Sequence, residues 1–190
     1  MKKSLFAFAA VAALALSTMG AAAQMMQAQM QDPMVGGAAM YPSKNIVENA
    51  MNSPIHKTLV AAVKAAGLVD TLEGAGPYTV FAPTDDAFAK LPAGTVDTLV
   101  KPENKATLDK ILTYHVVAGD ITSHDLKKWI KKGNGSYVAT TVEGGKLTFT
   151  MDMGKIKITD EKGGSAWITT ADVKQSNGEI HVINSVLMPS

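Results

Sequence analysis

Neither cysteine nor arginine occurs in this 190-residue chain. Without cysteine, the chain forms no disulfide framework and no zinc-thiolate site. All 18 basic residues are lysine, which lacks the planar fork that contacts phosphate or guanine in a bidentate manner. The formal net charge is only +1, so we do not expect the chain to bind nucleic acid.

The common catalytic motifs are also missing. There is no Gly-x-Ser-x-Gly elbow, no phosphate-cradling glycine-rich loop and no His-Glu-x-x-His helix. The four histidines are scattered without the spacing of metal ligands, at His56, His115, His124 and His181. We therefore predict that the protein is not an enzyme, and we expect no cofactor and no metal in its folded part.

The chain has no long apolar run. Its N-terminal apolar stretch, residues 5–16, is too short to span a bilayer comfortably. This stretch follows Lys2 and Lys3 and precedes the small residues 21–23, a pattern typical of a cleaved secretory signal over residues 1–23. We expect a secreted protein, in the periplasm or outside the cell at its surface, that does not span the membrane.

Residues 24–42 are rich in Met, Gln, Ala and Gly and show no periodic apolar face, which indicates a flexible linker. Asp32-Pro33 and Gly36-Gly37 interrupt any helix in this segment. The alternative is that its thioethers bind copper, because soft sulfur ligands select Cu(I). The candidate Cu(I) ligands are Met25, Met26, Met30 and Met34.

Apolar residues make up 46% of the chain, which allows one domain with a sizeable core, assigned to residues 43–190. The first half of this domain is predicted to be helical. One helix is expected from Ser43 to about residue 51, and a second from Ser53-Pro54 to just before Gly67. We expect His56 on the solvent side of the second helix.

A further helix, capped by Ser123, is predicted to bury Leu126 and Ile130. Four lysines surround this apolar stripe, at Lys127, Lys128, Lys131 and Lys132. Such a set is either a solvated face near a helix C-terminus or a binding surface for a polyanion such as an acidic polysaccharide.

From Gly133 onward the apolar residues alternate with polar ones, and glycine pairs separate the runs. This period of two predicts short strands joined in antiparallel meanders. A helical first half and a β-rich second half together indicate an α+β domain.

Two segments have a clear local structure. Residues 78–82 form a strand that Pro83 ends, and Thr84 then caps a helix with an acidic first turn. Near the C-terminus, Asn177-Gly178 is a turn signal before a strand that is apolar on both faces. Such a strand is covered on both sides, by a second sheet and by helices, so His181 is predicted to lie inside with a hydrogen-bond partner.

Three ordered boxes in the chain resemble the fasciclin domain family: TVFAPTDDAF (79–88), LTYHVV (112–117) and NGEIHVINSVL (177–187). The resemblance covers about residues 43–189. It implies a fasciclin-like, wedge-shaped antiparallel β-sandwich with helices packed along one side. It departs from the family at Asn184, where many members carry Asp.

The resemblance also implies a function. Fasciclin members are mostly secreted or surface proteins that mediate adhesion, and two of their partner-binding motifs match this chain. Asp172-Val173 matches an Asp-aliphatic motif, with Val173 where Ile is usual, and Tyr114-His115 matches a Tyr-His motif. The alternative from the residues alone is structural, since Asp172 suits a cap of the following turn, and Tyr114 and His115 suit core groups bonded to backbone.

Two functions follow from these observations. The first is an exported adhesion or protein-interaction module, expected to be a monomer, that contacts a cell-surface or matrix protein or a polysaccharide. The second is a periplasmic ligand- or copper-binding protein, which uses the Met-rich tail or a pocket between helices and sheet.

Overall fold

The computed structural model describes residues 32–190 and contains one compact unit from Pro33 to Ser190. The predicted signal peptide and three of the candidate copper ligands, Met25, Met26 and Met30, lie outside the described residues. Among the residues that are described, none of the helices has the length and apolar character needed to cross a membrane.

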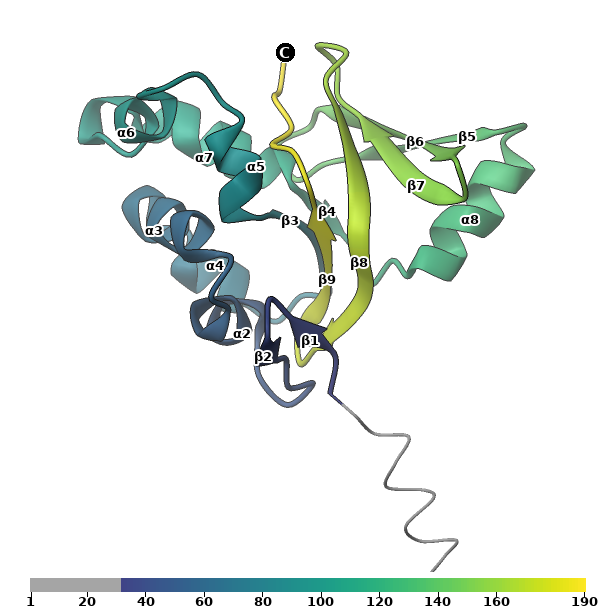
Figure 1. The fold of residues 1–190 in the computed structure, drawn as a ribbon, viewed down its shortest axis with the longest axis horizontal. Coiled ribbons are helices and arrows are strands. Elements are labelled where there is room, and N and C mark those ends of the chain that lie inside the picture. Colours follow the sequence, from purple (N-terminus) through teal and green to yellow (C-terminus); the bar gives the residue numbers. More distant parts are fainter. Residues whose placement is uncertain (1–31) are drawn as a thin grey trace, which may run out of the picture. The chain divides into compact units, whose positions relative to one another are not determined.

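A mixed sheet of seven strands organises the unit, in the order β4-β3-β9-β8-β7-β6-β5 (Figure 1). β3 and β9 are parallel, and the other neighbouring pairs are antiparallel. The long strand β8 joins the two halves of the sheet, because residues 165–167 pair with β7 and residues 168–175 pair with β9. The strands are β3 (Tyr78–Pro83), β4 (Val116–Ala118), β5 (Ser136–Thr140), β6 (Lys146–Asp152), β7 (Lys155–Thr159), β8 (Ser165–Gln175) and β9 (Gly178–Ile183).

The helices form two groups (Figure 1). All but the last pack near β3 and β9, whereas α8 lies against β5, β6 and β7. The helices are α2 (Ile46–Asn52), α3 (Lys57–Ala66), α4 (Val69–Glu73), α5 (Asp85–Ala89), α6 (Thr95–Leu99), the 3-10 turn η1 (Pro102–Asn104), α7 (Lys105–Tyr114) and α8 (Ser123–Lys132). The α+β class and the fasciclin-like architecture are thus confirmed, with α8 as one helix outside the main group.

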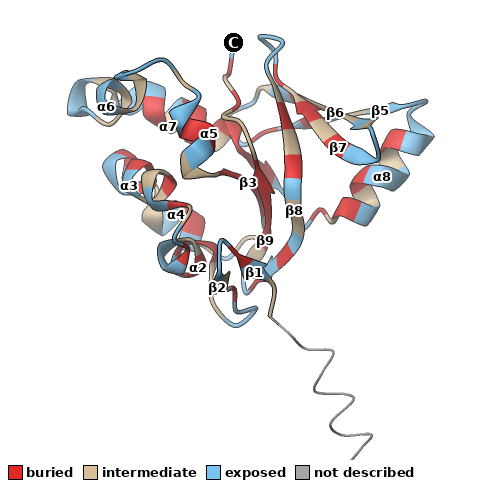
Figure 2. Cartoon of the chain, viewed as in Figure 1, coloured by how far each residue is buried: buried red, intermediate tan, exposed pale blue. Residues whose placement is uncertain are grey.

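Two hydrophobic cores lie on opposite faces of the central strands, which Figure 2 shows as the most buried part of the sheet. The first, which we call the helix-side core, lies between the central strands and helices α2, α3 and α7, and it contains Ile180 and Val182 of β9. The second lies between the central strands, β5 to β7 and α8, and it contains Ile183 and Leu187. Both faces of β9 are therefore covered, as predicted, but the face of Ile183 also carries the buried polar residues Glu179 and His181. At about 25 cal/mol per Å² of buried apolar area, this two-sided burial makes β9 a central stabilising element.

Three helix starts differ from the prediction. Asn45, not Ser43, caps α2 through a capping box with Glu48. Thr122, not Ser123, caps α8 through a capping box with Asp125. α3 begins at Lys57, after the Ser53-Pro54 segment, and ends as predicted at Gly67.

His56 was predicted to face solvent, and this prediction is wrong, since His56 is 2% exposed. The physical reason is a capping arrangement from a distant element. Ser53 Oγ lies 2.7 Å from His56 Nδ1, and the Asp85 carboxylate of α5 accepts a hydrogen bond of 2.8 Å from the Thr58 N–H in the first turn of α3. These contacts hold the start of α3 against α5, and His56 is buried there.

The compact unit begins at Pro33, inside the segment 24–42 that the sequence indicated as a linker. β1 (Met34–Val35) and β2 (Ala38–Ala39) form a hairpin whose turn is Gly36-Gly37. Both glycines have positive φ, the conformation that a two-residue hairpin turn requires. The turn allows Val35 and Met40 to enter the helix-side core, while Met34 stays 57% exposed.

Candidate functional site

Tyr114 is buried at the end of α7. Its hydroxyl donates a hydrogen bond of 2.7 Å to the Lys146 carbonyl and accepts one of 3.1 Å from the Glu161 N–H. Burial raises the pKa of Tyr114, so the hydroxyl stays protonated and can donate. The side chain ties α7 to β6 and to the loop between β7 and β8.

His115 is also buried, and both of its ring nitrogens have backbone partners. Nδ1 lies 2.8 Å from the Ile111 carbonyl and donates to it, while Nε2 accepts a hydrogen bond of 3.0 Å from the Leu187 N–H. Burial lowers the pKa of His115 to about 4, so the ring is neutral at pH 7. It connects α7 to the C-terminal segment.

Asp172 and Val173 lie where β8 is irregular, next to a register shift against β9. Val173 is 0% exposed and belongs to the helix-side core. Asp172 is exposed and has a left-handed backbone with φ of 59°. Its carboxylate accepts hydrogen bonds of 2.6 Å from both the N–H and the Oγ of Ser123, at the first residue of α8. Partial burial opposes ionisation, but these bonds outweigh it and lower the pKa of Asp172.

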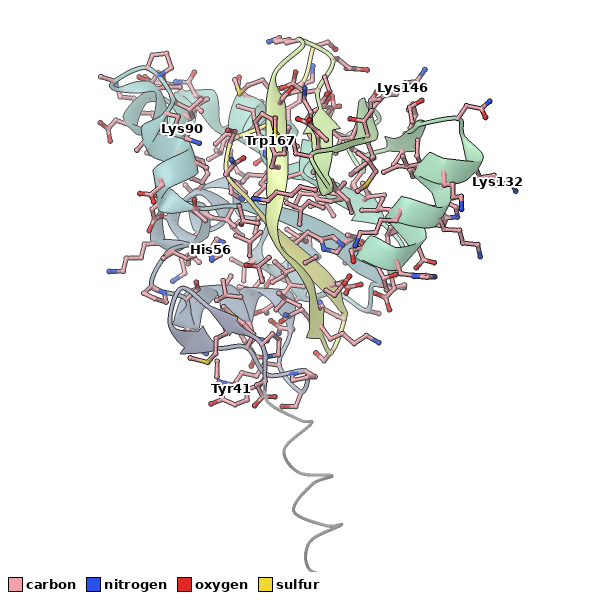
Figure 3. All side chains as sticks on the ribbon, turned by 45° about the vertical axis from the view of Figure 1, so that its right-hand side comes forward. Tyr41, His56, Lys90, Lys132, Lys146 and Trp167 are labelled. Atoms are coloured by element: carbon pink, nitrogen blue, oxygen red, sulfur yellow. The ribbon has the colours of Figure 1, made fainter. Side chains whose placement is uncertain are left out.

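Of the four residues that the sequence selected for partner binding, Asp172 is therefore the one exposed at the surface. The structure does not join Asp172 to Tyr114 or His115 by any hydrogen bond among residues 32–190. Asp172 contacts the start of α8, and the exposed lysines follow along that helix towards its C-terminus, where Figure 3 shows Lys132 projecting away from the sheet. We call this surface the Asp172–α8 surface, and it consists of Asp172, Lys127, Lys128, Lys131 and Lys132.

Asp172 also belongs to a cluster of three ionisable side chains that the sequence analysis did not predict. Asp172, Glu179 and His181 each offer one ligand atom, and these atoms all lie within 4.8 Å of one another. Glu179 is 0% exposed, and neither of its carboxylate oxygens has a hydrogen-bond partner among the described residues. Burial, together with the neighbouring Asp120 and Asp172 carboxylates, raises the pKa of Glu179 to about 8.

His181 lies inside with hydrogen-bond partners, as predicted. Its Nε2 lies 2.7 Å from the Ile121 carbonyl and donates to it, so Nδ1 is the acceptor for the Asp172 N–H at 3.2 Å. Burial lowers the pKa of His181. The signal for the cluster was present in the sequence, because Glu179 and His181 are two residues apart on one strand and share a face.

The predicted pocket between helices and sheet corresponds to an apolar cavity of about 30 Å³. Typical small-molecule sites have about 300–1,000 Å³, so this cavity is too small to hold a ligand of that size. It is lined mainly by α2, α3, α7 and β3, at Ile46, Val47, Leu59, Val63, Val80, Leu112 and other residues of the helix-side core.

Comparisons with known proteins show the family of the chain. The Fasciclin domain profile matches residues 54–189. Protein sll1483 of Synechocystis is 45% identical over 96% of this chain and 94% of its own length. Cell surface glycolipoprotein MPB83 of Mycobacterium bovis is 34% identical, covering 88% of this chain and 79% of the relative.

Immunogenic protein MPB70 of Mycobacterium bovis is 39% identical over 74% of this chain and 66% of the relative. Among solved structures, a domain pair from the insect cell adhesion molecule Fasciclin I has a TM-score of 0.67 at 21% identity, which shows the fold alone. The match covers 76% of this chain and 51% of that one, so the chain spans about half of the domain pair. The chain belongs to the fasciclin domain family.

Proposed function

We propose that this protein is an exported, non-enzymatic interaction module that contacts a cell-surface or matrix component through the Asp172–α8 surface. The single observation that carries the proposal is the position of Asp172, which is exposed while its three companion candidates are buried. Family membership supports it, as does the name of the relative MPB83, which describes a cell-surface glycolipoprotein.

The charge of this surface indicates the kind of partner. Four lysines are exposed on α8, and among the described residues the salt bridge lies elsewhere, between Lys110 and Glu143. A free lysine cluster beside one carboxylate favours an acidic polysaccharide or an acidic protein surface. The proposal includes export by the N-terminal signal, a monomeric chain and no nucleic-acid partner.

The test is attachment of bacterial cells to beads coated with the full chain. In the variant K127S/K128S/K131S/K132S, attachment is expected to fall at least fivefold and to become insensitive to salt, because screened charges steer such contacts. The matched control is the replacement of four exposed lysines outside this surface, Lys57, Lys64, Lys101 and Lys105. Equal attachment by both variants would contradict the proposed surface.

Copper binding by the Met-rich segment remains the alternative function. Met34 is exposed in the hairpin, which leaves its thioether available. A Cu(I) titration of the full chain, beside a variant with Leu at Met25, Met26, Met30 and Met34, tests it. Binding that disappears in the variant would support the alternative, and equal binding would contradict it.

A further inference from the structure

Glu179 is buried beside two other carboxyl groups, those of Asp120 and Asp172. Its residue is 0% exposed, and both carboxylate oxygens are without a hydrogen-bond partner among residues 32–190. An ionised carboxylate in such a place is strongly disfavoured unless a proton or a positive charge compensates it. In the described part of the chain, no lysine forms a salt bridge with Glu179.

Two other possible metal ligands lie beside Glu179: His181 on the same face of β9, and Asp172 on the neighbouring strand β8. One atom each from Asp172, Glu179 and His181 lie within 4.8 Å of one another. In a tetrahedral Zn²⁺ site with ligands at about 2.1 Å, neighbouring ligand atoms are about 3.4 Å apart. The three side chains would therefore have to move closer together to share one ion.

His181 supplies the ring nitrogen of the cluster. Its Nε2–H donates to the Ile121 carbonyl at 2.7 Å, which leaves the Nδ1 lone pair on the side of Asp172. Metal-bound histidines commonly donate their second ring N–H to a carbonyl in this way. Nδ1 accepts a hydrogen bond of 3.2 Å from the Asp172 N–H, at the long end of the ordinary range, and an ion bound at Nδ1 would displace this bond.

Asp172 forms the solvent side of the cluster. Its two carboxylate oxygens accept hydrogen bonds of 2.6 Å from Ser123, and each oxygen keeps a second lone pair. Because Asp172 is exposed while Glu179 and His181 are buried, an ion can enter past Asp172 and then lie between the three side chains.

We propose that Asp172, Glu179 and His181 bind one divalent cation, and that Zn²⁺ fits this donor set best. One imidazole and two carboxylates supply nitrogen and oxygen ligands, both of which Zn²⁺ accepts, and three protein ligands leave a fourth position open to water. Ca²⁺ and Mg²⁺ prefer sets made of oxygen alone. The site includes Asp172 of the proposed contact surface, but the binding of the ion does not depend on the adhesion function.

The experiment is a calorimetric titration of the metal-free full chain with Zn²⁺ near neutral pH, with Ca²⁺ titrated in parallel. We expect one equivalent of Zn²⁺ to bind, and Glu179→Gln to weaken that binding at least tenfold. Asp97→Asn is the matched control, because Asp97 is an exposed carboxylate on α6, and it is expected to bind Zn²⁺ as the unchanged chain does.

Circular dichroism shows whether Glu179→Gln is folded. If it is not, Asp172→Asn gives the same comparison from an exposed position, with weaker Zn²⁺ binding expected. Absence of Zn²⁺ binding would overturn the proposal, as would equal affinity in the unchanged chain and in the folded variants. Tighter binding of Ca²⁺ than of Zn²⁺ would overturn the assignment of the ion. Attachment of cells is not measured here, so failure of this site and failure of the contact surface are distinguishable.

Discussion

His115 and His181 are both buried histidines of the same fold, yet their surroundings differ. Both nitrogens of His115 contact backbone groups, at 2.8 and 3.0 Å. His181 has two backbone partners as well, but it lies beside the buried carboxylate of Glu179, which has none among the described residues. The difference between the two histidines is thus the neighbouring carboxyl group: His115 contacts backbone groups alone, whereas His181 adjoins a buried acid that accepts no hydrogen bond from the described residues, and the proposed ion site rests on that acid.

The largest expected effect on stability is that of His115→Ala, which removes both hydrogen bonds of the ring. The change leaves the Ile111 carbonyl and the Leu187 N–H without partners and opens a cavity, so we expect the free energy of unfolding to fall by about 3–4 kcal/mol. Urea denaturation measures it. His124→Ala, at an exposed position on α8, is the control, with a change within about 0.5 kcal/mol. A similar loss in both variants would contradict the structural role of His115.

The second-largest expected effect is the loss of stability at low pH, where His115 becomes protonated. The pKa of His115 is lowered from 6.5 to about 4 in the folded chain, so the unfolded chain binds more protons between these values. The contribution of His115 is therefore fully present above pH 6.5 and is lost as the pH falls towards 4, by about 3 kcal/mol in total. Protonated Nε2 would point a hydrogen at the Leu187 N–H, and the Asp160 charge only partly offsets this.

The measurement is the free energy of unfolding at a series of pH values for the unchanged chain and for His115→Gln. Glutamine keeps one donor and one acceptor but does not titrate in this range. The difference between the two curves is expected to shrink as the pH falls from 6.5 to 4. His56 and His181, whose pKa values burial also lowers, remain in both proteins and cancel. A constant difference would show that His115 does not carry the effect.

Tyr114→Phe tests the partner of His115 in the same box. Removing the hydroxyl leaves the Lys146 carbonyl and the Glu161 N–H without this bond in a buried place, so we expect a loss of about 2 kcal/mol. Thermal unfolding measures the loss. Tyr41→Phe, at a residue 41% exposed, is the matched control. If Tyr114→Phe were as stable as the control, the hydroxyl would not be a structural tie.

Asp172→Asn, next to His181, has the smallest expected effect on stability. Asparagine still accepts a hydrogen bond from the Ser123 N–H, but the negative charge at the start of α8 is lost. In the absence of metal, we expect the free energy of unfolding to fall by about 1 kcal/mol, measured in urea. Asp86→Asn, in the first turn of α5, is a comparison at another helix start. A loss above about 3 kcal/mol would show that Asp172 does more than cap α8.

The sequence predicted features whose causes are local. The Thr84 cap of α5 is confirmed, since its side chain accepts a hydrogen bond from the Ala87 N–H. The apolar residues of β9 face the cores as their alternation indicated. In both cases the physical determinant is a spacing of two or three residues, which a single segment contains.

The same reasoning failed where the determinant is distant. His56 is buried because Asp85, on another helix, caps the start of α3. The parallel pairing of β3 and β9 was not predicted either, because these strands are far apart in the chain and their turn signals do not report it. The cluster of Asp172 with Glu179 and His181 depends on two register shifts in β8, which the alternation of residues does not reveal.

The sequence by itself therefore determined the fold class, the three fasciclin boxes, most elements and the two-faced character of β9. The tertiary structure alone decided which of the four candidate residues reach the surface, and that Glu179 is enclosed without a partner. The physical reason is that helix caps and alternation arise from neighbours in the chain, whereas the burial of a polar group is fixed by every element that packs around it.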